Sequence, residues 1–160
     1  MTVPVRLMTR DDAAAAHILH TRAFPEAEVW SAWALQDTLA LSTTLGLATE
    51  EEGQLSGMII VQKVPPDADI LTMCVHPEKQ RQGLATHLLT GMLGLLGPAG
   101  VSKLYLDVAE DNDAAIAFYE SSGFLADGRR KGYYQREGGV RMDAILMSRP
   151  IAGHIAESEA

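Results

Sequence analysis

Residues 70–108 constrain the fold of this chain more than any other segment. Residues 70–75 (ILTMCV) have the apolar character of a buried strand, residues 84–96 carry apolar side chains at helical spacing, and residues 101–108 (VSKLYLDV) alternate like a second strand. A helix that connects two neighbouring strands of one sheet requires those strands to be parallel, because antiparallel neighbours need only a short turn. The segment therefore predicts an α/β domain with a parallel crossover.

The flanking segments predict further elements of the same sheet. Thr9, Ser31 and Asn112 each stand where a side chain can cap a following helix. We expect helices over residues 9–22, 31–41, 84–96 and 112–122, and strands over residues 5–8, 45–49, 54–64, 70–75, 101–108, 124–128 and 140–148. Residues 129–139 (RRKGYYQREGG) are expected to be a loop. The result is a mixed sheet of about seven strands with about four helices, in which residues 45–75 form a meander.

Chain length and composition indicate one globular domain. A chain of 160 residues buries about two-thirds of its unfolded surface around a single core. We assign residues 1–150 to that domain and expect residues 151–160 to form a flexible tail. The longest nearly uncharged run, LLTGMLGLLGPAGV, is too short to cross a bilayer, so no membrane partner is expected. Two acidic residues at positions 11 and 12 disfavour an export signal, which predicts a cytoplasmic protein.

Charge and cysteine content exclude other classes. Cys74 is the single cysteine, so an intramolecular disulfide and a multi-cysteine zinc site are both excluded. The formal net charge of −8, with a pI near 5.0, disfavours direct nucleic-acid binding and suits a cationic partner. We expect no metal.

The stretch VHPEKQRQGLAT, residues 75–86, predicts an anion site. Gly83 can adopt the dihedral angles that bring main-chain N–H groups close to a ligand, and the first turn of the following helix leaves N–H donors unpaired. Directly after a buried strand, such donors suit a diphosphate. The alternative reading, an ordinary helix start beside a solvated charge run, is equally compatible with RQGLA taken alone.

Two sequence motifs, which occur in the expected order along the chain, together resemble those of one enzyme superfamily. VHPEKQRQGLA resembles the acetyl-CoA pyrophosphate motif of the GCN5-related N-acetyltransferase (GNAT) superfamily, with Gln80, Gly83 and Ala85 in its fixed places. DNDAAIAFYESSGF resembles the second signature of the same superfamily. Within it, RAFPEAEVWS, QRQGLA, AAIAFYES and RRKGYY are similar to bacterial enzymes that acetylate the N-terminal alanine of a ribosomal protein, over roughly residues 15–151.

The resemblance implies the GNAT fold, acetyl-CoA as co-substrate, and roles for particular residues. Tyr119 is implied as the acid that protonates the CoA sulfur and Asp107 as the base for the acceptor amine. Acetyl transfer is expected by direct attack in a ternary complex, because no activated nucleophile is evident. The residues implied to contact acetyl-CoA are Met73, Cys74, Val75, Arg81, Gln82, Gly83, Leu84, Ala85, Thr86 and Asn112. Those implied to contact the acceptor are Trp30, Tyr133 and Tyr134.

Departures from the family pattern leave alternatives open. Asp107 stands where the related enzymes have glutamate, so it is expected to act through a water, or only as a structural acceptor. Ala109 stands where they commonly have arginine, which weakens the inference of a protein acceptor. Tyr119 could also be a half-buried packing residue. The alternative functions are acetylation of a small amine, such as a polyamine, amino acid or aminoglycoside, and a CoA-sensing module without catalysis.

Several other residues invite readings that we disfavour. Cys74 is expected to be a buried small side chain rather than a nucleophile. His17 and His20 are expected to be surface or boundary residues rather than metal ligands. Trp30 and Trp33, with Phe24, are read first as core packing.

Overall fold

The computed structural model describes residues 3–80 and 82–151, which fold into a seven-stranded mixed sheet with four α-helices. The strands are β1 (Val5–Leu7), β2 (Thr44–Glu51), β3 (Gln54–Val64), β4 (Asp67–Val75), β5 (Lys103–Ala109), β6 (Leu125–Gln135) and β7 (Arg141–Pro150). The helices are α1 (Ala13–Ala23), α2 (Ala32–Leu39), α3 (Leu84–Leu96) and α4 (Asp113–Ser121). Short 3-10 turns cover Arg10–Asp12, Glu26–Glu28, Pro77–Lys79 and Glu137–Gly139.

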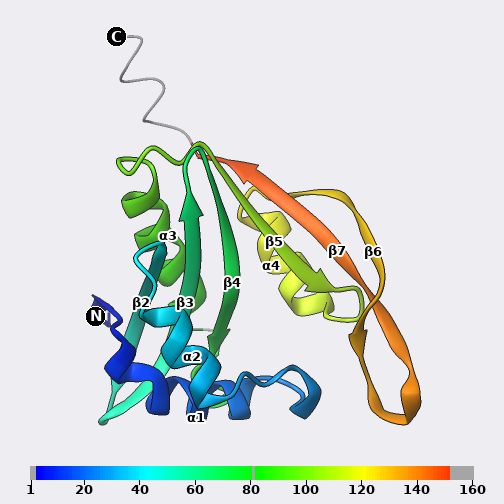
Figure 1. Cartoon of the computed structure of the whole chain (residues 1–160), viewed down its shortest axis with the longest axis horizontal. Coiled ribbons are helices and arrows are strands. Elements are labelled where there is room, and N and C mark those ends of the chain that lie inside the picture. Colours follow the sequence, from blue (N-terminus) through cyan, green and yellow to red (C-terminus); the bar gives the residue numbers. More distant parts are fainter. Residues whose placement is uncertain (1–2, 81, 152–160) are drawn as a thin grey trace, which may run out of the picture.

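Strand order across the sheet is β1-β2-β3-β4-β5-β7-β6. The expected meander of β2, β3 and β4 is antiparallel throughout, and α3 connects the parallel pair β4 and β5, as the sequence predicts. The parallel pairing is short, because only Asp67, Ala68 and Asp69 have partners on β5. Beyond Asp69 the two strands diverge, and Figure 1 shows β4 continuing with the meander while β5 turns away with β6 and β7.

Helices cover both faces of the sheet, and the sheet separates two hydrophobic cores. On one face α3 packs against the central strands, and this core also takes in Tyr119 from α4 and the buried Phe124. On the other face α1 and α2 pack over β2 to β4, with Leu19, Leu35 and Met58 at its centre. The meander thus packs between two layers of helices, and Figure 1 shows α1 and α2 over that half of the sheet.

The segment at residues 129–139 corrects the sequence prediction. Residues 129–135 belong to β6 rather than to a loop, and β6 pairs with β7 as far as Gln135. The register shifts between Arg130 and Tyr134, which marks a bulge. Because β6 is an edge strand, it tolerates the glycine and the charged side chains that make the segment resemble a loop.

Both ends of the domain differ slightly from expectation. Thr9 caps the 3-10 turn Arg10–Asp12 in a capping box with Asp12, and α1 follows directly. Ile151, where we placed the start of the tail, is buried, and its N–H donates a hydrogen bond to the carbonyl of Ser102. The rest of the expected tail, residues 152–160, lies outside the described residues. Among the residues with a described structure, no helix is long and apolar enough to cross a membrane.

Candidate active site

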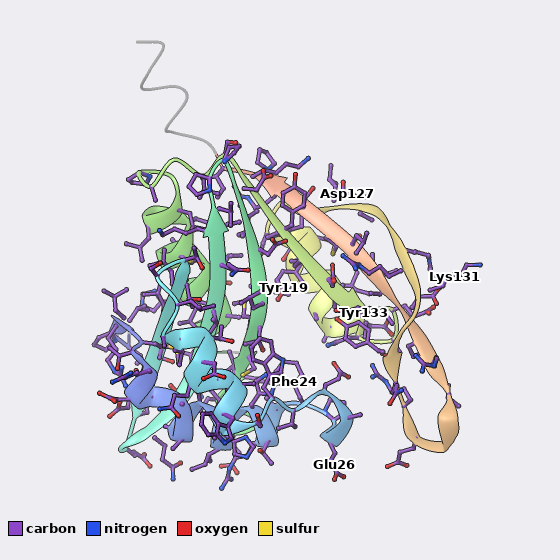
Figure 2. All side chains as sticks on the ribbon, viewed as in Figure 1. Phe24, Glu26, Tyr119, Asp127, Lys131 and Tyr133 are labelled. Atoms are coloured by element: carbon purple, nitrogen blue, oxygen red, sulfur yellow. The ribbon has the colours of Figure 1, made fainter. Side chains whose placement is uncertain are left out.

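A cavity of about 820 Å³ occupies the space between the diverging strands β4 and β5. Its other walls come from the loop before α2, from α4, and from β6 and β7. Figure 2 shows Tyr119 at the gap between the strands, with Phe24 on the α1 side and Tyr133 on the β6 side. Seven of the predicted site residues line the cavity: Trp30, Met73, Asp107, Asn112, Tyr119, Tyr133 and Tyr134.

The β4 edge that faces the cavity has main-chain groups without a strand partner. Pairing to β5 ends at Asp69, so no strand of the described residues pairs with Leu71 or Met73 on that side. On the opposite side the pairing to β3 skips Leu71, because Ile60 pairs with Thr72 and Val61 with Ile70. This bulge is not evident from the sequence. The open edge offers N–H and C=O groups in the spacing of a strand, which suits an extended ligand with amide groups.

The N-terminus of α3 follows β4 after one 3-10 turn. Gly83 is its N-cap in the left-handed conformation (φ 79°), and a Cβ placed there would meet no heavy atom within 4 Å. The first helical hydrogen bond runs from the N–H of His87 to the carbonyl of Gly83, so the N–H groups of Leu84, Ala85 and Thr86 precede it. Open space beside these donors fits an anionic group such as a diphosphate.

The predicted phosphate-binding residues therefore differ in whether their side chain or only their main chain can contact a ligand. Gln82 and Thr86 expose their side chains, whereas the Leu84 side chain is buried, so only its main chain can contact a ligand. These residues do not line the cavity but lie where β4 leads into α3. Arg81, the one charged residue predicted here, lies outside the described residues.

Tyr119 is fixed by packing on the inner face of α4. Its ring lies edge-on to Phe118 and to Phe124, with centroid distances of 5.3 and 5.4 Å. Burial raises the pKa of its hydroxyl, and the nearby Cys74 and Tyr134 would raise it further if charged. The hydroxyl is therefore protonated at neutral pH and can act as an acid. Asn112, the N-cap of α4, accepts a hydrogen bond from the N–H of Ala115 and shares the cavity wall with Tyr119.

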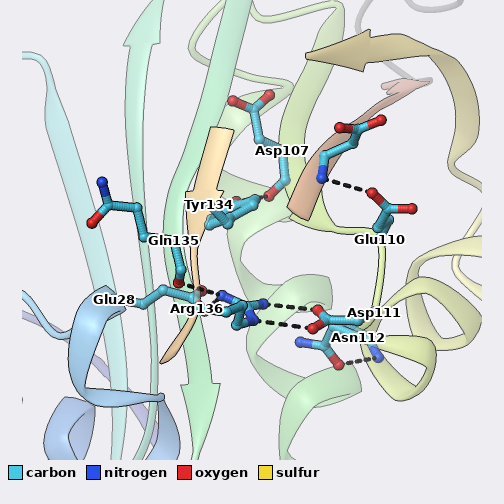
Figure 3. Close-up of polar contacts among 10 residues, drawn as sticks. Glu28, Asp107, Glu110, Asp111, Asn112, Tyr134, Gln135 and Arg136 are labelled. Carbon is cyan, nitrogen blue, oxygen red and sulfur yellow. Dashed lines mark hydrogen bonds and ion pairs between the residues drawn. The ribbon is translucent and has the colours of Figure 1, made fainter. Parts of the chain in front are cut away.

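Asp107 projects from β5 at the opposite wall. Its Oδ2 lies 3.6 Å from Nε of Arg130, so its carboxylate faces a cation. The Tyr134 hydroxyl donates a 3.3 Å hydrogen bond to the main-chain carbonyl of Asp107. Figure 3 shows the carboxylate of Asp107 pointing away from that carbonyl. Burial raises the pKa of Tyr134, and the charge of Asp107 adds to this shift, so Tyr134 also stays protonated at neutral pH.

An ionic cluster that the sequence did not reveal lies beside the cavity, which one of its residues, Glu28, also lines. Arg136 bonds Asp111 through two nitrogens, at 2.8 and 3.0 Å, and its third nitrogen bonds Glu28 at 2.7 Å. Figure 3 shows the guanidinium between these carboxylates, next to Asn112. Burial raises the pKa of Glu28, and Arg136 opposes that shift. We call Arg136, Glu28 and Asp111 the rim cluster. It joins the loop before α2, the end of β6 and the turn after β5.

Two histidines hold the loop that carries Trp30. His20 is buried, and its Nδ1 accepts a hydrogen bond from the Trp30 N–H, so Nε2 carries the proton that it donates to Thr72. Burial lowers the pKa of His20 to about 4. The Nδ1 of His17 lies 2.8 Å from the Trp30 carbonyl. The expectation that His20 lies at the surface or boundary was therefore wrong, because it is buried and bonded to two neighbouring elements.

Two further side chains bear on the disfavoured readings. Trp33 is 74% exposed, which contradicts its assignment to the core, while Trp30 is half-buried beside the cavity. Cys74 is buried among the residues packed under α1, and burial raises the pKa of its thiol to about 12. A thiol that stays protonated is a poor nucleophile. In the part of the chain that the structure describes, no group of three His, Cys, Asp or Glu side chains could hold a metal.

Comparison with known proteins decides the family. The sequence profile of the acetyltransferase (GNAT) family matches residues 10–124. The chain belongs to this family. It is an acetyl-CoA-dependent N-acetyltransferase, with acetyl-CoA as co-substrate.

Individual GNAT relatives extend the comparison over almost the whole chain. The [ribosomal protein bS18]-alanine N-acetyltransferase of Escherichia coli is 37% identical over 150 residues, which is 91% of this chain and 95% of that protein. The N-alpha-acetyltransferase RimI of Mycobacterium tuberculosis is 32% identical over 151 residues, 92% of each. The crystal structure of the ribosomal-protein-S18-alanine N-acetyltransferase from Escherichia coli superposes with a TM-score of 0.86, covering 95% of this chain and 96% of that one. The GNAT fold predicted from the sequence is thus confirmed.

Proposed function

We propose that this enzyme transfers acetyl to the N-terminal alanine of a ribosomal protein in the cytoplasm. The observation that carries the proposal is the cavity between β4 and β5, which brings a protonated tyrosine, Tyr119, and a carboxylate, Asp107, to the same space. Relatives that span nearly all of the chain are named for alanine N-acetylation of the ribosomal protein bS18. The cationic N-terminus of a protein also suits an acidic enzyme of net charge −8.

The binding of acetyl-CoA would use the open main chain on either side of the 3-10 turn Pro77–Lys79. The edge of β4 at Met73, Cys74 and Val75 would lie along the pantetheine arm and donate to the acetyl carbonyl. The first turn of α3, from Gln82 and Gly83 through Leu84 and Ala85 to Thr86, would hold the pyrophosphate with Arg81. Asn112 at the start of α4 would contact the cofactor from the other side.

The chemistry would proceed by direct attack. The acceptor ammonium gives one proton to a carboxylate, with Asp107 as the predicted base. The neutral nitrogen then forms a bond to the thioester carbon, and the carbon–sulfur bond breaks. The Tyr119 hydroxyl protonates the departing thiolate, and the resulting phenolate takes the second proton from the nitrogen as the amide forms. Since the pKa of Tyr119 is raised, its phenolate is a strong base that regains a proton readily.

The acceptor would enter between the loop before α2 and the β6 strand. Trp30, Tyr133 and Tyr134 line this side of the cavity, and the rim cluster fixes the distance between the two walls. Tyr133 is 52% exposed, and the Arg130 guanidinium lies 5.5 Å from its ring centroid. Exposed aromatic side chains next to a cavity can bind a peptide at low conformational cost.

The test is a thiol-release assay with acetyl-CoA and a panel of acceptors. A bS18 hexapeptide with a free N-terminal alanine is compared with the same peptide N-formylated, and with polyamines, free amino acids and an aminoglycoside. We expect turnover of the free peptide only. Turnover confined to small amines would reject the protein acceptor. Tight acetyl-CoA binding without turnover of any amine would instead favour a CoA-sensing module.

The Tyr119→Phe variant tests the acid. It removes only the hydroxyl and retains the ring contacts with Phe118 and Phe124. We expect kcat to fall about 10²-fold or more, the lower range for loss of a general acid, while the calorimetric affinity for acetyl-CoA stays unchanged. An unchanged kcat would remove Tyr119 from the mechanism.

A further inference from the structure

Asp69 is a carboxylate in the cavity that neither the motifs nor the family resemblance assigned. It is the last residue of β4 that pairs with β5, with Tyr105 as its partner, and it lines the cavity at the point where the strands diverge. Its neighbours Ala68 and Ile70 belong to the core under α3, as do Leu104, Leu106 and Val108 on β5. Since side chains alternate along a strand, Asp69 and Asp107 project together from the opposite face of the sheet, the acceptor side.

Register places the two carboxylates near each other. Asp107 lies two residues beyond Tyr105, the partner of Asp69, on the same face of the sheet, and its charge acts on Asp69. Arg130 acts on both carboxylates: its guanidinium pairs with Asp107, and its charge lowers the pKa of Asp69. Two carboxylates and one guanidinium leave one negative charge without a counterion in this group. That balance suits an acceptor with one ammonium.

The electrostatic surroundings favour Asp69 as a proton acceptor. Partial burial raises the pKa of Asp69, the charges of Asp107 and then Asp67 raise it further, and Arg130 lowers it. Asp67 lies outside the cavity lining and pairs in register with Lys103. A carboxylate with a raised pKa takes a proton from an ammonium more readily than an unperturbed one, because its pKa lies closer to neutral pH.

We propose that Asp69 is a second catalytic carboxylate, which shares with Asp107 the removal of the proton from the acceptor ammonium. This inference rests on the proposed N-acetyltransferase reaction and names one more residue of its site. The proton passes from the ammonium to Asp69, directly or through a water, and from there to solvent at the open cavity mouth. The neutral amine then attacks as described. The pair compensates for Asp107, whose side chain is one methylene shorter than glutamate and faces Arg130.

The decisive variants are Asp69→Asn, Asp69→Glu and a matched control, Asp67→Asn. Asp67 is the same residue type on the same strand and face, and also acts on Asp69, but it does not line the cavity. With the free bS18 hexapeptide at neutral pH we expect Asp69→Asn to lower kcat/KM for the peptide about 10²-fold, the lower range for a general base. Asp69→Glu should retain at least about a tenth of the activity, because it keeps the carboxylate. Asp67→Asn should change it less than about threefold, because Asp67 does not line the cavity.

The pH dependence separates a base from a structural residue. An α-amine with a pKa near 8 is about one-tenth neutral at pH 7 and almost wholly neutral at about pH 9.5. The deficit of Asp69→Asn should therefore shrink about tenfold over this range, because the neutral amine needs no base. The affinity for acetyl-CoA, measured by calorimetry, should not change. The double variant Asp69→Asn/Asp107→Asn should lose about as much as the poorer single variant, since residues that act as one unit are not additive.

Three results overturn the inference. One is an Asp69→Asn variant with wild-type kcat/KM at neutral pH. Another is a deficit that is the same at every pH, or that Asp69→Glu shares fully, which marks a packing role. The third is an equal loss in Asp67→Asn, which marks a general effect of negative charge. Each of these requires an active wild-type enzyme, so failure of the proposed function shows separately as a wild-type chain without turnover.

Discussion

Removal of the Arg136 guanidinium should destabilise the protein, and the cost should depend on pH. Arg136 and Glu28 have side chains only 19% and 17% exposed, and they are 108 residues apart in the sequence. Two unit charges at 2.7 Å attract with about 6 kcal/mol at an effective dielectric constant of 20, and loss of hydration cancels most of this. Exposed pairs contribute about 0.2–1 kcal/mol, and breaking a fully buried pair costs about 3–5 kcal/mol. We therefore expect Arg136→Gln to lower the free energy of unfolding by about 2 kcal/mol at neutral pH.

The direction of the pH effect follows from the two carboxylates. The pKa of Glu28 is raised by burial, so the cost of its unpaired charge disappears as the pH falls through that raised pKa. The pKa of Asp111 is lowered, first by its hydrogen bond to Arg136, so the stability that it contributes is also lost as the pH falls. The cost of Arg136→Gln should thus roughly halve by about pH 4, where Glu28 is mostly protonated.

Urea unfolding followed by circular dichroism measures this cost in a double-mutant cycle. In a Glu28→Gln background, Arg136→Gln should cost about 1 kcal/mol less than in the wild type, because only Asp111 remains as a partner. The KM of Arg136→Gln for the peptide should rise while its KM for acetyl-CoA is unchanged, since the rim cluster holds the acceptor side. An Arg136→Gln cost that is equal in both backgrounds and at both pH values would refute this account of the rim cluster.

Further predictions concern His20, Gly83 and the core under α2. Burial lowers the pKa of His20 from 6.5 to about 4, so the unfolded state takes up a proton before the folded state as the pH falls. About 3 kcal/mol of the free energy of unfolding should therefore be lost between these two pH values. His20→Gln should remove this pH dependence, measured by urea unfolding. Gly83→Ala should weaken the binding of acetyl-CoA, measured by calorimetry. The added Cβ would meet no atom, but an alanine in the left-handed conformation costs about 1–2 kcal/mol. Equal affinity would contradict a ligand-binding role for this turn. Leu35→Ala, at a fully buried position, should lower the free energy of unfolding by about 2–5 kcal/mol, whereas Trp33→Ala, two residues earlier on the same helix and largely exposed, should change it by about 0.5 kcal/mol or less.

Local signals made much of the fold and part of the site predictable. The helix start at Gly83, the cap at Asn112 and the alternating strand before Ala109 depend on neighbouring residues, and the structure has each of them where the sequence places it. The side chains of Tyr119 and Asp107 then reach one cavity because the crossover fixes the two strands and α4 follows at once.

The features that the sequence did not reveal depend on distant contacts. The Glu28–Arg136 pair joins residues far apart in the chain, and no local pattern marks either residue. The bulge that skips Leu71 arises from pairing with β3, and the strand at residues 129–135 owes its conformation to β7 rather than to its own polar composition. Burial of His20 on α1 follows from packing against Phe24 and from its hydrogen bond with the Thr72 hydroxyl on β4. Side-chain alternation on β4, combined with the register to β5, is the signal that could have identified Asp69.

The two halves of the sheet are joined by three residue pairs between β4 and β5 and by the core under α3. One half is the meander with its two layers of helices, and the other is the β5, β7 and β6 ribbon, joined to it by few main-chain hydrogen bonds. A co-substrate bound along the β4 edge, as proposed above, would add contacts on the side of β4 that faces the β5, β7 and β6 ribbon. At a concentration one hundred times its dissociation constant it adds about 2.7 kcal/mol to the stability of the fold. Depletion of acetyl-CoA would then remove this added stability.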